Sequence, residues 1–436
     1  MTVHDRPTWL GGQGVLARAV GRPLARFLEV EAAGGMVLVA AAVVGLAWAN
    51  SPWSAAYHDL WATDLGIQLG RFGIEHDLRH WIDDGLMAVF FFVIGLEIKG
   101  ELVTGALRTW RGALAPAAAA LGGMVVPALV YTALNAGGEG GAGWGIPMAT
   151  DVAFALGVLA LLGDRVPAGL KVLLLALAIV DDLGAVAVIA LFYTDDLDPL
   201  WGLAALAGLA AVAVLRRAGV RYLPAYLVLG AGVWLATLGS GVHATIAGVA
   251  LGLLTPARPL LSAPDADRIA GRLTADPQVT AAAVRAASFD LRESVAPTER
   301  LAGLLHPWTS YVVVPLFALA NAGVDLSPDR LGDALGSPVT AGVAAGLVLG
   351  KPVGILLALS AVRRLGWADL PDGVGPRHLL GMAVLAGVGF TVSTFIAGLA
   401  FDGAALVDEA KVGILTASLV AASAGALVLR RAPQPA

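Results

Sequence analysis

The chain has 436 residues, of which 58% are hydrophobic and 14% charged, whereas an ordinary soluble domain carries about 25% charged residues. This composition excludes a cytosolic enzyme, and the mean hydropathy of +0.78 indicates that most of the apolar surface faces lipid. Because the chain has no cysteine, it has no disulfide framework and no thiolate metal site. The net charge of −5 leaves no basic face for nucleic acid. We expect a polytopic membrane protein that is not an enzyme and uses no cofactor.

Twelve apolar runs, separated by charged or Pro/Gly-containing segments, are predicted to cross the membrane as helices. The predicted fold class is therefore an all-α polytopic membrane protein with 12 transmembrane helices. The spans lie near residues 34–50, 84–106, 113–135, 145–163, 171–193, 199–215, 222–238, 241–256, 305–324, 339–362, 379–401 and 409–429.

The distribution of basic residues tests this count independently. If the N-terminus is cytoplasmic, the cytoplasmic segments hold 23 of the 28 Lys and Arg residues, and Lys351 lies inside a span. The outer segments hold only Arg71, Arg79, Arg330 and Lys411. This asymmetry is what the positive-inside rule predicts. We therefore expect a single integral-membrane domain over 1–436 with both termini cytoplasmic, an N-terminal segment over about 1–30 and a tail over 430–436.

Two segments outside the predicted spans have patterns of their own. The alternation around Gly70–Arg71 is equally compatible with a short external β-hairpin near 65–74 and with an ordered loop. The long cytoplasmic loop covers 257–304. Within it, Asp276–Pro277 has the pattern of an N-cap followed by Pro at the first helical position, and the Ala-rich stretch towards Ser294 predicts a surface helix.

Four ionisable residues lie well inside predicted spans: Asp151, Asp181, Asp182 and Lys351. Each costs about 2.5–3.5 kcal/mol at the centre of a membrane helix, so such residues usually line a polar pathway. The structural alternative is a buried ion pair that only holds helices together. One lysine cannot neutralise three carboxylates, and we therefore favour a functional role.

Asp181 and Asp182 point about 100° apart on a helix. In a low dielectric, neither of two neighbouring carboxylates stays ionised without a cation or a proton. Such a site binds a hard cation through oxygen ligands, or it binds protons, and the two compete. This competition is the chemical basis of cation/proton exchange.

Lys351 is unusual because only four of the 28 basic residues are lysine. Arginine does not give up its proton in a protein, whereas a desolvated lysine can. The hypothesis is that Lys351 pairs reversibly with an aspartate or carries a transported proton. A static counter-ion is the alternative.

Residues that interrupt helices lie close to these charges. Pro147 precedes Thr150–Asp151 in the fourth span, and Gly387 and Gly389 lie in the middle of the eleventh. Paired interrupted helices in two repeats indicate an ion site near the membrane midplane. We predict inverted-topology repeats formed by spans 3–5 and 10–12, with discontinuous spans 4 and 11. Gly and Pro are also common in uninterrupted membrane helices, so this pattern is weak when taken alone.

Several strings in the sequence carry a resemblance to one family. They are Asp84-Gly-Leu-Met-Ala-Val-Phe-Phe with Gly95-Leu-Glu-Ile-Lys99, Ala149-Thr-Asp-Val-Ala-Phe-Ala-Leu-Gly157, Ala178-Ile-Val-Asp-Asp-Leu-Gly184, Ser240-Gly-Val-His-Ala-Thr245, His306-Pro-Trp308 with Pro315-Leu-Phe-Ala-Leu-Ala-Asn-Ala-Gly323, Gly350-Lys-Pro-Val-Gly354 and Gly389-Phe-Thr-Val-Ser393. With these strings the chain resembles the NhaA-type sodium/proton antiporters, which are built from inverted repeats.

The resemblance implies crossed, interrupted fourth and eleventh spans and exchange of two external protons for one internal Na⁺ or Li⁺. Asp181 and Asp182 match the family's ion- and proton-binding pair and would ligate the transported Na⁺. Lys351 matches the membrane lysine that pairs with the residue at Asp181, and Asp151 with Thr150 matches the polar group at the helix crossing. The family commonly dimerises through an external hairpin, here near 65–74. It functions in pH homeostasis at the cytoplasmic (inner) membrane of prokaryotes.

The resemblance also implies residues linked to pH response, and for four of them a structural alternative is open. Glu97 and Glu101 match acids of a cytoplasmic funnel, but they are equally compatible with interfacial solvation. Asp84 also matches, although it is placed to cap a helix. His243 matches a pH-linked histidine, and a hydrogen-bonded interhelical histidine is the alternative. His306 matches the start of the ninth span. The preceding loop is longer than the family pattern, so we do not assume alkaline activation.

The predicted function is electrogenic, pH-regulated Na⁺/H⁺ exchange across the lipid bilayer, with small cations as partners and no nucleic acid. The alternative is a Na⁺-coupled carrier of an organic anion on the same fold, which would need cationic anchors that the spans lack. An intramembrane aspartyl protease is disfavoured because its two aspartates must come from separate helices.

Overall fold

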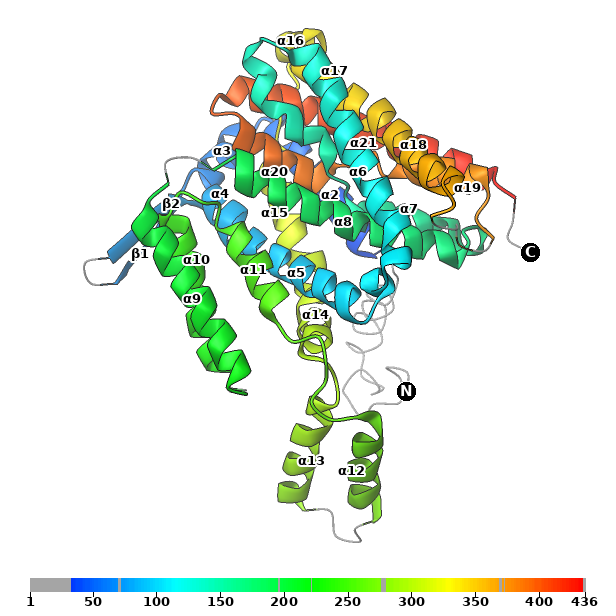
Figure 1. Cartoon of the computed structure of the whole chain (residues 1–436). Helices are drawn as coiled ribbons and strands as arrows, with labels where there is room; N and C mark the ends of the chain where they lie inside the picture. Colours follow the sequence, from blue (N-terminus) through cyan, green and yellow to red (C-terminus); the bar gives the residue numbers. More distant parts are fainter. Residues whose placement is uncertain are drawn as a thin grey trace, which may run out of the picture.

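The computed structural model describes residues 33–69, 72–194, 197–220, 222–275, 280–367, 371 and 373–433. These residues form a predominantly helical body from which two hairpins project, one of strands and one of helices (Figure 1). The predicted N-terminal segment, the turn at Gly70–Arg71 and the predicted helix start at Asp276–Pro277 lie outside the described residues.

The helices follow the chain in this order. The first are α2 (Ala33–Ala49), α3 (Ser54–Trp61), α4 (Leu78–His80), the π-helical turn η4 (Trp81–Leu86), α5 (Met87–Val103), the 3₁₀ turn η5 (Ala106–Arg108) and α6 (Trp110–Asn135). They are followed by the 3₁₀ helix η6 (Glu139–Met148), α7 (Val152–Leu162), η7 (Gly163–Arg165), α8 (Ala168–Phe192), α9 (Pro199–Arg217), α10 (Leu223–Gly239) and α11 (Thr245–Leu254). Next come α12 (Ala263–Ala275), α13 (Ala281–Glu293), α14 (Pro297–Trp308), η8 (Thr309–Val313), α15 (Val314–Asn321) and α16 (Pro328–Gly336). The last are α17 (Pro338–Ala345), the π-helical turn η9 (Gly346–Gly350), α18 (Lys351–Arg364), α19 (Pro376–Leu385), α20 (Phe390–Ala400) and α21 (Ala404–Arg430).

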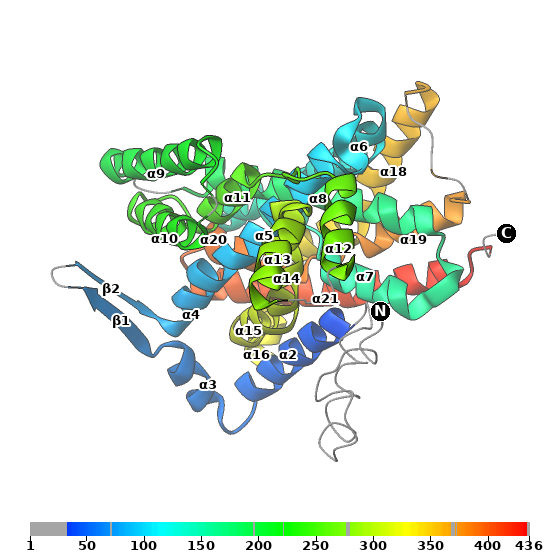
Figure 2. The same ribbon diagram turned by 90° about the horizontal axis from the view of Figure 1, so that it is seen from below.

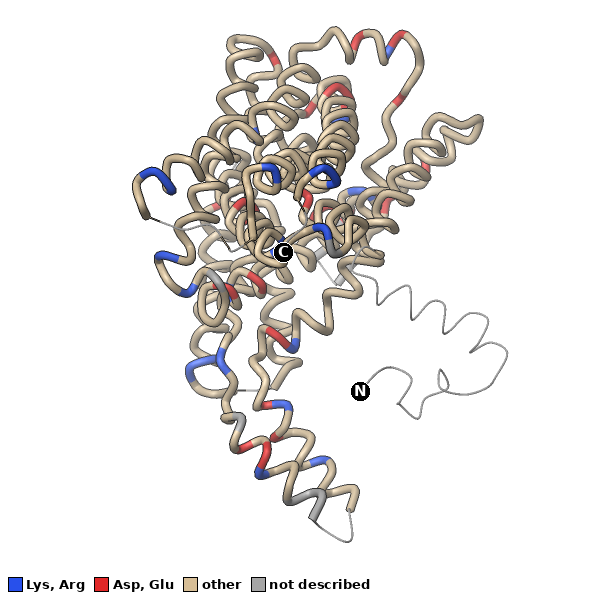
Figure 3. The backbone as a smooth tube through the Cα atoms, turned by 90° about the vertical axis from the view of Figure 1, so that its right-hand side faces the viewer, with Lys and Arg blue, Asp and Glu red and all other residues tan. Residues whose placement is uncertain are grey.

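Many of these helices are long and apolar enough to cross a bilayer. Among the described residues, six helices meet this requirement, and up to nine do if each bent pair counts as one span. Figure 3 shows few charged residues along the helical body and several on the hairpin of α12 and α13. A helical, multi-pass membrane architecture is therefore confirmed, whereas the count of twelve stays a prediction.

Two helices are broken where the sequence predicted discontinuous spans. The pair η6 and α7 bends by 42° at Ala149–Asp151, and the pair α19 and α20 bends by 42° between Leu385 and Phe390. The two breaks touch: a Cβ added at Gly389 would lie 2.8 Å from the carbonyl oxygen of Ala149. Only glycine allows this approach. We call residues 149–151 and 386–389 together the helix crossing.

Helix α8 lies inside the body and carries Asp181 and Asp182. It contacts α5, α6, α7, α19 and η6, so both broken pairs border it. Its neighbour α5 packs closely on α11, since a Cβ at Gly95 would lie 2.7 Å from the carbonyl oxygen of Val249. These contacts fix the surroundings of the aspartate pair.

The segment after α3 is a β-hairpin. Strand β1 (Asp64–Leu69) pairs antiparallel with β2 (Phe72–Asp77), with Ile67 opposite Ile74. The hairpin prediction is therefore confirmed, and the described part of the chain is not purely helical. Figure 2 shows the hairpin extending away from the helical body.

The second predicted span begins earlier than expected. The helix starts at Leu78, and the Asp77 side chain caps it by accepting a hydrogen bond from the backbone N–H of His80 at 2.7 Å. The alternative in which Asp84 caps this helix is therefore wrong. The polar first turn around Arg79 concealed the true start, because hydropathy detects only the apolar part of a helix.

The ninth span and the loop before it also differ from the prediction. Helix α14 begins at Pro297, so residues 297–304 belong to it, and the predicted start at 305 is wrong. The loop contains two helices instead of one, because α12 and α13 form a hairpin below the body (Figure 1). Helix α13 begins at Ala281 and is capped by Thr280.

Candidate functional site

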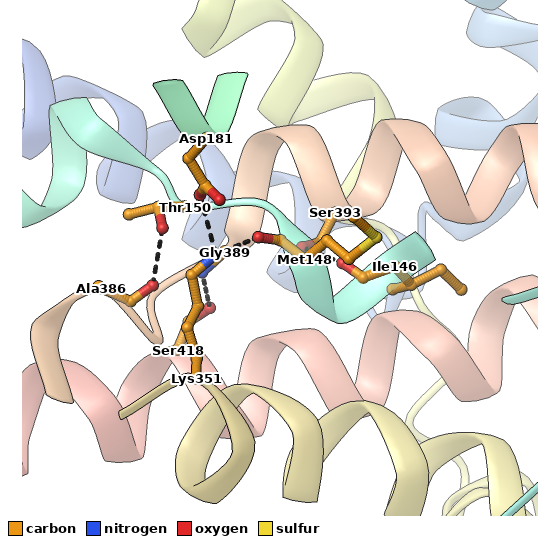
Figure 4. Close-up of polar contacts among 9 residues, drawn as sticks. All are labelled: Ile146, Met148, Thr150, Asp181, Lys351, Ala386, Gly389, Ser393 and Ser418. Atoms are coloured by element: carbon orange, nitrogen blue, oxygen red, sulfur yellow. Dashed lines mark hydrogen bonds and ion pairs between the residues drawn. The ribbon is translucent and has the colours of Figure 1, made fainter. Parts of the chain in front are cut away.

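An ion pair between α8 and α18 forms the centre of the candidate site. Lys351 Nζ lies 2.9 Å from Asp181 Oδ2, and both side chains are 0% exposed. The same ammonium also donates a hydrogen bond to the carbonyl oxygen of Met148, at the end of η6 (Figure 4). The lysine therefore connects the aspartate helix to one of the broken helices.

Local sequence explains how Lys351 reaches this position. The π-helical turn η9 ends directly before it, and such wide turns are frequent at functional sites. The following helix lies against α6 at Gly354 and Gly122, where neither residue has room for a Cβ. Because the two helices approach so closely, the aliphatic part of the Lys351 side chain packs against α6. A Cβ added at Gly123 would lie 3.7 Å from Lys351 Cγ.

Asp151 connects the two broken pairs. Its carboxylate accepts a hydrogen bond from the N–H of Phe154 at 3.0 Å and another from the N–H of Thr391 at 3.2 Å. Its own N–H donates to the carbonyl oxygen of Val388 at 2.6 Å. One buried carboxylate thus lies at the N-termini of both α7 and α20, where the helix dipoles are positive.

Hydroxyl side chains form hydrogen bonds with further backbone groups at the ends of the broken helices. The Thr150 hydroxyl donates to Ala386 O at 3.0 Å, and the Ser393 hydroxyl donates to Ile146 O at 2.6 Å. The Ser418 hydroxyl of α21 accepts the N–H of Gly389 at 3.4 Å. Ser393 belongs to one of the motifs quoted above, whereas Ser418 could not be predicted, because one serine in an apolar helix forms no pattern.

Asp182 lies next to the ion pair and is 6% exposed. The charges of Asp181, Glu97, Asp151 and Lys351 all act on its carboxylate. On Asp181, Oδ1 is buried without a hydrogen-bond partner among the described residues. Two carboxylates with spare oxygen lone pairs therefore lie on adjacent residues in the buried interior. Carboxylate oxygens are the donors that hard cations prefer.

The candidate pH-response residues occupy separate places. Glu97 lies on α5, one turn before Glu101, and its charge reaches Asp182. His243 Nε2 forms a hydrogen bond with Tyr193 O at 2.6 Å, which is the interhelical contact of its structural alternative. His306 is exposed on α14, with Nδ1 3.3 Å from Ser310 Oγ. It lies in the interior of that helix and not at its start.

Asp84 belongs to a different cluster from Asp181 and Lys351. One of its carboxylate oxygens lies 3.2 Å from Nε2 of His80, one helical turn earlier. Its backbone carbonyl oxygen accepts a hydrogen bond from the indole of Trp234 at 2.9 Å. The structure thus brings together Thr150, Asp151, Asp181, Asp182 and Lys351, and it places Asp84, His243 and His306 in other contacts.

Comparison with known proteins identifies the family. The family model described as Na⁺/H⁺ antiporter 1 matches residues 25–429. The chain belongs to the Na⁺/H⁺ antiporter 1 family. The resemblance drawn from the motifs is therefore confirmed, and so is the description of a membrane protein of ion transport.

Relatives in the Na⁺/H⁺ antiporter 1 family align over nearly the whole chain. Na(+)/H(+) antiporter NhaA 2 of Sorangium cellulosum is 48% identical over 440 residues, covering 98% of this chain and 94% of that protein. Na(+)/H(+) antiporter NhaA of Rhodopirellula baltica is 49% identical over 424 residues, covering 95% of each chain. Na(+)/H(+) antiporter NhaA 3 of Frankia alni is 46% identical over 438 residues, covering 99% of this chain and 92% of that protein.

Proposed function

We propose that the protein exchanges external H⁺ for internal Na⁺ or Li⁺ across the cytoplasmic membrane of a prokaryote. One observation carries the proposal: Asp181 and Asp182 lie together in the interior, and a single lysine bonds to only one of them. The relatives are named Na(+)/H(+) antiporters, which favours the same exchange here. An organic-anion carrier finds no support, since Lys351 already pairs with Asp181.

The ion pair supports a count of two protons per sodium ion. In the paired state, Asp181 is ionised and Lys351 is charged, and a proton on Asp182 makes the site neutral. Na⁺ competes with the ammonium for the oxygens of Asp181, and it binds both carboxylates once Asp182 and Lys351 have each released a proton. The occupied site then has a net charge of −1. One positive charge therefore moves inward in each cycle.

This net charge movement makes the exchange electrogenic. An inside-negative potential contributes about 2.3 kcal/mol per elementary charge for every 100 mV. That energy exceeds a tenfold concentration ratio, which corresponds to about 1.4 kcal/mol. The membrane potential can therefore drive sodium extrusion when the pH gradient is small, and the transporter needs no cofactor.

Asp151 and Thr150 would act as positioning residues in this cycle. The Asp151 carboxylate neutralises two helix N-termini at the helix crossing, and Thr150 occupies one C-terminal carbonyl. Asp151 and Thr150 thus neutralise the partial charges at the ends of the broken helices while both broken pairs move relative to α8. Lys351 has a second function here, because it also neutralises the end of η6.

We further propose the complete architecture of twelve spans, with both termini cytoplasmic and inverted repeats formed by spans 3–5 and 10–12. The equal 42° bends of the fourth and eleventh spans support the repeats. Dimerisation through the hairpin near 65–74 is supported by its paired strands. Glu97, Glu101, His243, His306 and Asp84 are proposed to set the pH response, and the electrostatic influence of Glu97 on Asp182 favours this role.

A vesicle experiment tests the exchange directly. A pH gradient is imposed across proteoliposomes, and Na⁺, Li⁺ or K⁺ is then added. We expect Na⁺ and Li⁺ to collapse the gradient with wild-type protein, and K⁺ to have no effect. Asp182→Asn is expected to show no collapse. Equal activity in this variant, or none in the wild type, would contradict the proposed function.

A further inference from the structure

A second group of ionisable side chains lies at the far end of span two, next to the β-hairpin. His76 is the penultimate residue of β2, and its ring stacks on that of His80 with centroids 3.9 Å apart and an interplanar angle of 18°. His80 in turn faces Asp84, with 3.2 Å between Nε2 and Oδ2. Together with Trp81 and Trp234 these residues line a small pocket, and we call the five residues the outer cluster.

The stacked histidines favour the uptake of one proton and disfavour two. Two imidazolium rings this close would repel each other. Burial and the neighbouring His80 lower the pKa of His76, whereas His80 faces the Asp84 carboxylate. Histidine is also the side chain whose ordinary pKa lies within the physiological range.

The other ionisable groups around the outer cluster do not take the place of His80 as the partner of Asp84. On the hairpin, Asp77 is engaged as the cap of α4. On the same helix, Asp83 accepts a hydrogen bond from Asn321 of α15. His243, between α10 and α11, acts on Asp84 through its charge, but its Nε2 is bonded to Tyr193 O. His80 is therefore the titratable partner in contact with the Asp84 carboxylate among the described residues.

The cluster joins three parts of the molecule. The Trp81 indole donates a hydrogen bond to Leu65 O of β1 at 2.9 Å, and the Trp234 indole of α10 donates to Asp84 O at 2.9 Å. The two indole rings stack with centroids 6.1 Å apart. His80 directly precedes the π-helical turn η4, and Asp84 lies within it. A change in their charge therefore acts where the hairpin, α10 and span two meet.

We propose that His76, His80 and Asp84 form a proton-operated switch that reads the pH of the external solution. Protonation of His80 closes its ion pair with Asp84 and holds η4 against the hairpin and α10. Loss of that proton leaves the half-buried carboxylate without its cation and favours opening of the outer end of span two. The inference rests on the proposed exchange and on the external location of the hairpin.

The switch reaches the exchange site through one continuous helix. Span two runs from α4 through η4 into α5, which carries Glu97. The charge of Glu97 acts on Asp182, and α5 contacts α8 directly. A shift of the outer end of span two is therefore transmitted to the helix that holds the aspartate pair. External protonation is expected to slow exchange, and loss of the proton to speed it.

The test compares His80→Gln with His58→Gln, which removes an exposed histidine of the neighbouring helix α3. Exchange is measured in right-side-out vesicles with the internal pH fixed and the external pH varied. Relative to His58→Gln, we expect His80→Gln to exchange about fivefold faster at external pH 6 and equally fast at pH 8, since a closed ion pair of this kind contributes up to about 1 kcal/mol. Varying the internal pH should not separate the two variants.

A second variant tests the stacked pair. His76→Gln removes the like-charge neighbour of His80, so the external pH profile of exchange should shift to higher pH. A profile identical to that of His58→Gln in both variants would overturn the switch.

A measurement without transport separates this proposal from the proposed function. Protonated His80 beside Trp81 should quench tryptophan fluorescence of the purified protein in detergent, with a one-proton titration that His80→Gln lacks. If wild-type protein shows this titration but no exchange, the proposed function fails and the proton switch stands. If the wild type exchanges ions but its fluorescence titration equals that of His80→Gln, the switch is wrong and the proposed function is unaffected.

Discussion

Two pairs of adjacent aspartates lie on helices of this protein, and their surroundings differ. The inner pair, Asp181–Asp182, lies in the middle of α8 beside the helix crossing and contacts a buried lysine. The outer pair, Asp83–Asp84, lies in a π-helical turn at the end of span two and contacts an amide and a histidine. The same dipeptide thus has two different sets of partners. Under the proposed function, the inner pair is suited to ion exchange because it is buried and a lysine competes with the transported cation for Asp181.

The largest difference is expected when one acid of each pair is neutralised. Asp182→Asn should reduce Na⁺-dependent exchange to the level of empty vesicles, because the site loses both a sodium ligand and a proton carrier. Asp83→Asn should stay within about fivefold of wild type, which corresponds to one hydrogen bond of about 1 kcal/mol. Exchange rates in proteoliposomes check both values. Equal losses in the two variants would remove the distinction between the pairs.

The inner pair should also depend on its lysine for stability. Lys351→Met leaves Asp181 buried without its partner and should lower the free energy of unfolding by about 3–5 kcal/mol. Adding Asp181→Asn to this variant removes the uncompensated charge and should restore most of the loss. Thermal unfolding in detergent measures both effects. A double variant as unstable as Lys351→Met would argue that the ion pair has no such role.

The helix crossing belongs to the inner pair alone and can be perturbed without touching a charge. In Gly389→Ala the new Cβ would lie 2.8 Å from Ala149 O, and such overpacking costs about 1–3 kcal/mol. Gly398→Ala on the same helix α20 is a matched control, because a Cβ there meets nothing within 4 Å. We expect lower thermal stability and slower exchange only in Gly389→Ala. If the two variants behave alike, the close approach of the two breaks is not required.

The smallest effect is expected at the outer pair. Asn321→Ala removes the 2.8 Å hydrogen bond to Asp83 and should cost about 1 kcal/mol of stability, with exchange retained. Thermal unfolding and vesicle assays check this pair of outcomes. Complete loss of exchange in Asn321→Ala would instead place the outer pair in the transport machinery.

The features that can be predicted from the sequence are those for which the membrane sets a strong rule. Asp151, Asp181, Asp182 and Lys351 stand out because charge is costly inside a bilayer, and Pro147 with Gly387 marked both broken helices. The starts of α4 and α14 were missed because their first turns are polar, as at Arg79 and Glu299. Contacts between distant segments, such as that of Ser418 with Gly389, depend on tertiary packing and leave no local pattern.

The central claim is that sodium binds between Asp181 and Asp182 only as the site releases protons. Proton release from purified protein in weakly buffered detergent tests it most directly, because it requires neither a membrane gradient nor a fixed orientation. The account predicts that Na⁺ or Li⁺ releases protons from the wild-type protein, that K⁺ does not, and that Asp182→Asn gives no release. No release from the wild type, or the same release from Asp182→Asn, would contradict it.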